Sequence, residues 1–138
     1  MEDQLITILT AALLEEKVID DKTPAEEIPV FRQGSLGEDD AYPDTFLTFW
    51  GSGEVEQSAY DNNTATIVWR FDVNAYSTSV SMTYSLADTC RRLCKASGWQ
   101  TPDRGHDVAS DEITHTGRGI TVTHITTENP IKEEQANG

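Results

Sequence analysis

One run of alternating residues constrains the fold more than any other part of this chain. Apolar or small side chains fill the odd positions of the run: Ala65, Ile67, Trp69, Phe71, Val73 and Ala75. Most even positions between them are polar, with Val68 as the exception. Strands turn alternate side chains to opposite faces, so the pattern predicts a strand of about eleven residues with one buried face. Five or six residues are usual for a strand, and we expect this one to project past its own core.

Other segments complete a sheet around this strand. The aromatic, β-prone run TFLTFW at 45–50 predicts a partner strand, joined to the first as an antiparallel hairpin through a polar loop over 51–63. Residues 119–126 predict a further strand, and short strands are expected around 28–32 and at 99–100. In TFLTFW, Phe46 and Trp50 share one face and Phe49 takes the other. Large apolar residues on both faces fit either core packing or a contact between subunits.

Two helices are expected, over 3–18 and 79–97. The apolar stripe of the first is Leu5, Ile8, Leu9, Ala12 and Leu13. Acidic residues near its end oppose the helix dipole, so fraying is expected there. The core stripe of the second is Met82, Leu86, Cys90, Leu93 and Cys94. A Ser or Thr at 77–79 caps its start, and Gly98 ends it.

These elements predict an α+β fold. Two helices pack on one face of a mostly antiparallel sheet of about four strands, from which a long hairpin projects. Residues 1–127 form a single domain that includes an acidic connecting region over 19–44. The polar, glycine-containing segment 102–117 is a long loop or hairpin arm, and residues 128–138 are a flexible tail.

The charge of the chain excludes several classes of partner. Its 138 residues carry a formal charge of −14, with twelve acidic and three basic side chains before position 45. Such a surface binds neither phosphate backbones nor anionic membranes well. It suits solubility, mutual repulsion before assembly, or a surface that DNA slides past. No apolar run is long enough to span a bilayer and the N-terminus is unlike a signal peptide, so we expect the protein in a cytoplasm.

The chemical groups of the chain favour no enzyme, metal or cofactor. His106, His115 and His124 match no usual metal-ligand spacing. Ser110, Asp111 and His115 are close in sequence but lack a nucleophile elbow. Glu54 and Glu56 lie in a polar loop with no apolar pocket to raise a pKa. Cys90 and Cys94 are read as buried small hydrophobes, and TGRG at 116–119 lacks the helix that a phosphate loop requires.

Three segments together resemble a known family. They are FLTFWGSGEVEQSAYDNNTATIVWRFDVNAYSTS at 46–79, CKASGW at the end of the second helix, and GHDVASDEITHTGRGITVTHI at 105–125. The chain is similar over 45–126 to tail terminators, also called tail-to-head joining or tail completion proteins, of long-tailed phages and prophages of Gram-positive bacteria. The resemblance implies a non-enzymatic structural protein of the virion, assembled in the host cytoplasm. It would form a hexameric ring on the head-proximal end of the tail tube, stop tube polymerisation and meet the head connector. DNA would pass through the lumen without specific binding.

The resemblance and the pattern together define a set of candidate contact residues. A long strand with an unpaired edge can extend a sheet between subunits. A head-to-tail ring needs two complementary patches, here the aromatic hairpin and the basic end of the second helix. Segment 107–119 matches the family pattern and would contact neighbours or the tube. The expected interface residues are Phe49, Trp50, Arg70, Asp72, Arg91, Arg92, Lys95, Asp107, Asp111, His115 and Arg118.

Two alternatives stay open at the level of sequence. One is another component of the head–tail connector, such as a stopper or head-completion protein. The other is an acidic cytoplasmic binding protein, for instance an inhibitor that mimics the charge of DNA.

Overall fold

A computed structural model describes residues 1–33, 42–58 and 65–128 of the chain. The predicted flexible tail lies almost wholly outside these residues, as does part of the acidic connecting region. In chain order the elements are α1 (Glu2–Glu15), a 3₁₀ turn (Ala25–Glu27), β1 (Val30–Arg32), β2 (Thr45–Ser58), β3 (Ala65–Ser77), α2 (Val80–Ala96), β4 (His106–Val108) and β5 (Thr116–Glu128).

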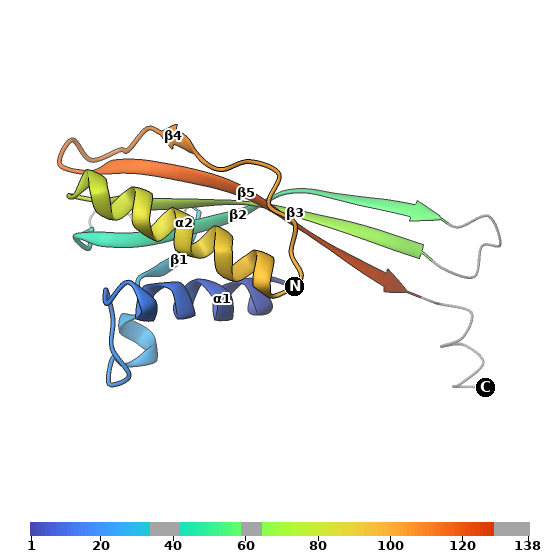
Figure 1. The fold of residues 1–138 in the computed structure, drawn as a ribbon, viewed down its shortest axis with the longest axis horizontal. Coiled ribbons are helices and arrows are strands. Elements are labelled where there is room, and N and C mark those ends of the chain that lie inside the picture. The colour runs from blue at the N-terminus through green and yellow to red at the C-terminus, as the bar shows by residue number, and fades with distance from the viewer. Residues whose placement is uncertain (34–41, 59–64, 129–138) are drawn as a thin grey trace.

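The strands form one sheet in the order β1-β2-β3-β5-β4. Only the pairing of β1 with β2 is parallel; the other three pairings are antiparallel. Both helices lie on the same face of the sheet (Figure 1). The predicted α+β class is therefore confirmed, with five strands where about four were expected.

β2 and β3 form a longer hairpin than the sequence indicated. The predicted strand at 45–50 continues to Ser58, so 51–58 is strand and the prediction of a loop from residue 51 was wrong. Pairing shifts between Gly51 and Gly53, which marks a β-bulge. Such a bulge changes which side chains face each side of the sheet and increases the local twist. β5 runs antiparallel to the whole length of β3, from Thr116 to Glu128.

α1 ends earlier than expected because Lys17 takes a left-handed conformation, with φ of 61°. The Val18 amide donates to the Leu13 carbonyl at 2.9 Å and the Lys17 amide to the Leu14 carbonyl at 3.1 Å. This pair of bonds is the Schellman motif, which closes a helix. The side chains of Glu15 and Glu16 turn to α2: Arg92 donates to Glu15, and Thr89 and Ser85 donate to Glu16 at 2.5 and 2.7 Å. These contacts oppose the fraying expected from the helix dipole.

α2 has the caps that its sequence predicted. The Ser79 side chain accepts from the Met82 amide at 3.3 Å. At the other end Gly98 has φ of 88° and the Trp99 amide donates to the Cys94 carbonyl at 2.9 Å, a second Schellman motif. Both cysteines are buried as free thiols in the core, as predicted.

The core fills the space between the helices and the sheet. Its buried apolar side chains come from α1, α2, the segment just after α2 and the alternating positions of the three long strands: Leu5, Leu9, Ala12, Leu13, Leu47, Phe49, Phe71, Val73, Ala75, Leu86, Ala87, Cys90, Cys94, Trp99, Ile120 and Val122. Phe49 takes the helix side and Trp50 the open side, as the alternation predicted.

The segment after α2 is more ordered than the loop that was predicted. Gln100 pairs with Thr123 as an isolated bridge, and β4 pairs with the start of β5. Between them the Asp103 carboxylate accepts from the Thr121 amide at 3.1 Å. This segment therefore covers the outer edge of β5 as far as Thr123.

Candidate assembly interface

β2, β3 and β5 extend together beyond the helices as a three-stranded arm (Figure 1). The half of the sheet nearest α1 and α2 is covered on one face, whereas no helix or other described strand lies against the arm. The pairing remains regular to its end, where Ser58 opposes Ala65 and Ala65 opposes Glu128. The expected projection of the long strand is thus present, and β5 takes part in it as well.

Both outer edges of the arm present backbone groups that no described residue pairs. On β5, Thr123 exchanges both of its backbone bonds with Gln100, so its amide and carbonyl point away from β3. Because this direction alternates along a strand, Ile125 and Thr127 point the same way, beyond the last bridge. On β2, the last bond to the outer side joins the Gln33 amide to the Phe49 carbonyl. After the bulge, the pairing register turns the backbone groups of Glu54 outward.

The open face of the sheet carries Trp50 and Asp72 as cross-strand partners. Trp50 is 47% exposed, a large area for a side chain of this size. Asp72 is half-buried and accepts from the Thr121 hydroxyl at 3.0 Å. Arg70 is exposed on the same face. The structure therefore brings these three predicted interface residues onto one surface, between the bulge and β5.

Phe49 is a correction to the predicted interface set. Its side chain is 3% exposed and belongs to the core beneath the helices. A buried side chain cannot reach a neighbouring subunit, so Phe49 supports the sheet from within.

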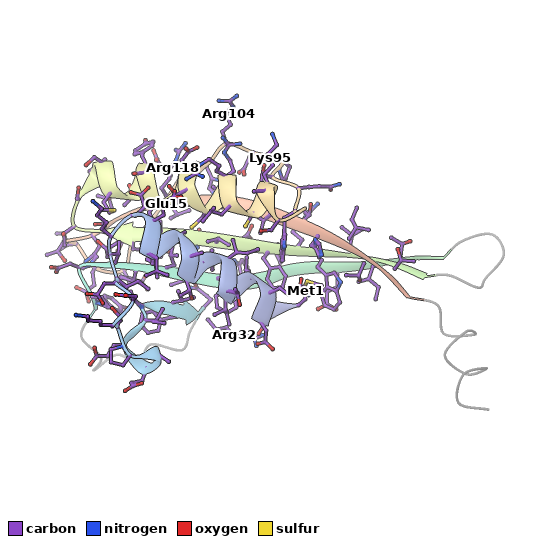
Figure 2. The ribbon with its side chains drawn as sticks, turned by 60° about the horizontal axis from the view of Figure 1, so that its bottom comes forward. Met1, Glu15, Arg32, Lys95, Arg104 and Arg118 are labelled. Carbon is purple, nitrogen blue, oxygen red and sulfur yellow. The ribbon has the colours of Figure 1, made fainter. Side chains whose placement is uncertain are left out.

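The basic end of α2 is partly neutralised inside the subunit. Arg92 forms an ion pair with Glu15, and Arg91 lies 3.3 Å from the Asp88 carboxylate. Lys95 and Arg104 have no ion pair within the described part of the chain and project outward (Figure 2). The charges of Arg91 and Arg92 are therefore already paired within the subunit, so the predicted basic patch is weaker than the sequence suggested. Lys95 and Arg104 are the basic side chains there that can pair with a neighbouring subunit.

Asp107 and Arg118 contact each other across β4 and β5. The Arg118 guanidinium donates to the Asp107 carboxylate at 3.2 Å and lies 4.5 Å from the centre of the Tyr84 ring. Arg118 thus fastens β4 to α2. Tyr84 was missed by the sequence analysis because nothing in α2 alone indicates that an arginine from β5 lies above it.

His115 holds its loop against the start of β2. Its Nε2 donates to the Pro43 carbonyl at 2.8 Å, which fixes the proton on that nitrogen, and Nδ1 lies 3.0 Å from the Thr114 hydroxyl. Both ring nitrogens are therefore engaged, and Ser110 instead accepts from the Glu112 amide. Neither residue is arranged as a nucleophile beside its base.

The other two histidines of the chain contact neighbouring side chains within the subunit. His106 pairs with Asp103 at 2.9 Å, and His124 stacks on Trp99 with ring centres 4.7 Å apart. The three histidines thus occupy separate environments. Among residues 1–33, 42–58 and 65–128, no group of three or more His, Cys, Asp or Glu is placed to hold a metal ion.

Comparisons with known proteins assign no family. No protein-family model matches the chain, and no curated protein is significantly similar to it. None of the helices in the described part of the chain has the length and apolar character to cross a membrane.

Proposed function

We propose that this chain is a structural subunit of a phage tail, a terminator that assembles with copies of itself at the head-proximal end of the tail tube. The observation that carries the proposal is the three-stranded arm, whose two outer edges are paired by no residue that the structure describes. β2 and β5 are both antiparallel to β3, so their free edges are parallel to each other and lie on opposite sides of the arm. One edge can pair with the other edge of the next subunit, and repetition of this head-to-tail contact gives a ring when the rotation between neighbours closes.

The surface charge supports the same proposal. A charge of −14 per subunit repels phosphate at close range, which suits a passage for DNA that does not bind it. Trp50 beside the bulge offers an apolar contact next to the edge of β2. The tail tube protein and a connector protein would meet the two rims of the ring.

Proline substitution tests the edge pairing without breaking the subunit. The amides of Glu54 and Thr127 point outward, so proline there removes a donor to a neighbour and none from the ladder with β3. We expect Thr127→Pro and Glu54→Pro to abolish assembly, measured by mass photometry in the presence of tail tubes. Thr127→Val keeps the amide and is the matched control, which should assemble. Circular dichroism checks that each variant is folded.

Negative-stain images of tails from a phage that lacks this gene then test the role. Terminator function predicts tubes of uncontrolled length. Tails of normal length that fail to join heads would instead indicate a connector component. Normal assembly by both proline variants would refute the edge-pairing basis of the proposal.

A further inference from the structure

Two basic side chains give the β5 side of the subunit a local positive charge. Lys95 lies in the last turn of α2, and Arg104 precedes β4. Among the residues that the structure describes, neither forms an ion pair, and both project from the same side of the molecule (Figure 2). The nearby acids already have partners inside the subunit: Asp88 with Arg91, Asp103 with His106, and Asp107 with Arg118. The charges of Lys95 and Arg104 are therefore left for a group outside the subunit.

The β2 side of the subunit carries acids instead. Glu54 is exposed on β2 just after the bulge, and Asp3 is exposed in the first turn of α1. Neither forms an ion pair within residues 1–33, 42–58 and 65–128. Arg32, the base on this side, lies 3.2 Å from the Glu2 carboxylate, so its charge is matched. Figure 2 shows Arg32 on the side opposite Lys95 and Arg104.

Glu54 and Lys95 lie at the same level along the strands. Glu54 opposes Trp69 across the ladder, and Trp69 in turn opposes His124. Trp69 packs against the core beneath the helices, so its cross-strand partner Glu54 also points to the helix side of the sheet. The His124 ring stacks on Trp99, which follows the end of α2. The acid and the base thus occupy the two ends of one row, both in the layer of the helices.

Arg104 and Asp3 are matched in a similar way, closer to the middle of the helices. The carboxylate that precedes Arg104 accepts from the Thr121 amide at 3.1 Å. The carboxylate that precedes Asp3 pairs with Arg32, which lies beside Phe49 in the sheet. Thr121 and Phe49 belong to adjacent rows of the three long strands. A second base and a second acid therefore face outward at nearly one level, on opposite sides.

We propose that these two sides meet between neighbouring copies of this chain, with Lys95 of one copy paired to Glu54 of the next. Arg104 and Asp3 form the second pair of the same contact. The inference rests on the edge pairing proposed above and adds what selects its direction. Pairing of β5 with β5, or of β2 with β2, would gather bases on one seam and acids on the other, and like charges repel. Such charges act on specificity and encounter rate more than on affinity.

Zero-length crosslinking with a carbodiimide tests the first pair directly, because this reagent joins an amine to a carboxylate that touches it. The full chain is used as an equal mixture of ¹⁴N- and ¹⁵N-labelled protein in the presence of tail tubes, so that a link between copies carries both labels. We expect a mixed-label link between Lys95 and Glu54, identified by mass spectrometry. Lys95→Arg keeps the charge but lacks the amine, so it should remove this link and still assemble.

Charge reversal separates pairing from folding. Lys95→Glu and Glu54→Lys should each weaken assembly about two- to thirtyfold, because an attraction becomes a repulsion. The chain that carries both changes again presents opposite charges at the contact and should recover assembly. Lys22→Glu makes the same charge change in the exposed loop after α1 and should assemble like the unmodified chain. Circular dichroism checks that each variant is folded.

Failure of this inference and failure of the edge pairing give different results. If Thr127→Pro abolishes assembly while both single reversals assemble normally, the charge match is overturned and the edge pairing stands. No recovery in the double variant, or a mixed-label link from Lys95 to a different carboxylate, would also overturn the match. If Thr127→Pro assembles normally, the edge pairing on which the match rests is refuted.

Discussion

Gly117 gives a sharp test of how closely β4 and β3 approach across β5. A Cβ built at this position would lie 2.8 Å from the Val108 carbonyl oxygen, 2.8 Å from the Tyr76 ring and 2.6 Å from a Val108 methyl group. One of these neighbours is backbone held in the β4–β5 pairing, so it cannot rotate away. Gly117→Ala must therefore move β4 or the Tyr76 ring.

The expected cost follows from two opposing effects. Overpacking of this kind costs about 1–3 kcal/mol, and replacing glycine restricts the unfolded chain by about 0.4–1 kcal/mol in favour of folding. The net loss is about 1–2 kcal/mol. With an unfolding entropy of about 2.1 cal/mol/K per residue over 138 residues, this lowers Tm by about 3–7 °C.

Gly53→Ala is the matched control, because no atom lies within 4 Å of a Cβ at Gly53. There only the restriction of the unfolded chain remains, and Tm should rise by about 1–3 °C. The assay is thermal unfolding followed by circular dichroism and tryptophan fluorescence. If the two alanine variants unfold at the same temperature, the close approach at Gly117 is not rigid and the reasoning fails.

Two further predictions concern α1 and the buried thiols. Lys17→Gly removes the left-handed penalty at the end of α1 and should stabilise the protein by about 1 kcal/mol in urea unfolding; Lys17→Ala should not. Burial raises the pKa of Cys94 to about 12 and that of Cys90 well above its usual 9.0. Above pH 9 these thiols keep their protons in the folded state but lose them in the unfolded state. Their contribution to the free energy of unfolding is therefore constant below pH 9 and falls as the pH rises from 9 toward 12. Cys94→Ala should make the free energy of unfolding, measured by urea unfolding, fall less steeply between pH 9 and 12. An equally steep fall in the variant would contradict this prediction.

Much of the fold was predictable because local pattern and tertiary packing agree. The alternation of apolar residues predicts β3, and each apolar stripe predicts one helix. The cap residues Ser79 and Gly98 mark the two ends of α2. The second half of β2 could not be predicted this way, since GSGEVEQS is polar and glycine-rich. Those residues are a strand because β3 provides a partner for each of them, which is information that local sequence does not contain.

The candidate interface was less predictable than the fold. The alternation of TFLTFW placed Trp50 on the open face, but whether Phe49 is covered depends on where the helices pack. Arg92 became an internal ion pair because Glu15 of α1 lies beside it, 77 positions away. A charge pattern in one helix predicts a surface only when the neighbouring elements are known.

The edge strands of the arm and the acidic charge of the chain are physically related. An exposed strand edge pairs readily with any other, which is why charges commonly guard such edges. Here Glu54 lies on an edge strand of the arm, where its exposed side chain carries such a charge. Salt at physiological ionic strength screens its repulsion beyond about 8 Å, so it opposes mainly those edge contacts that bring another carboxylate close.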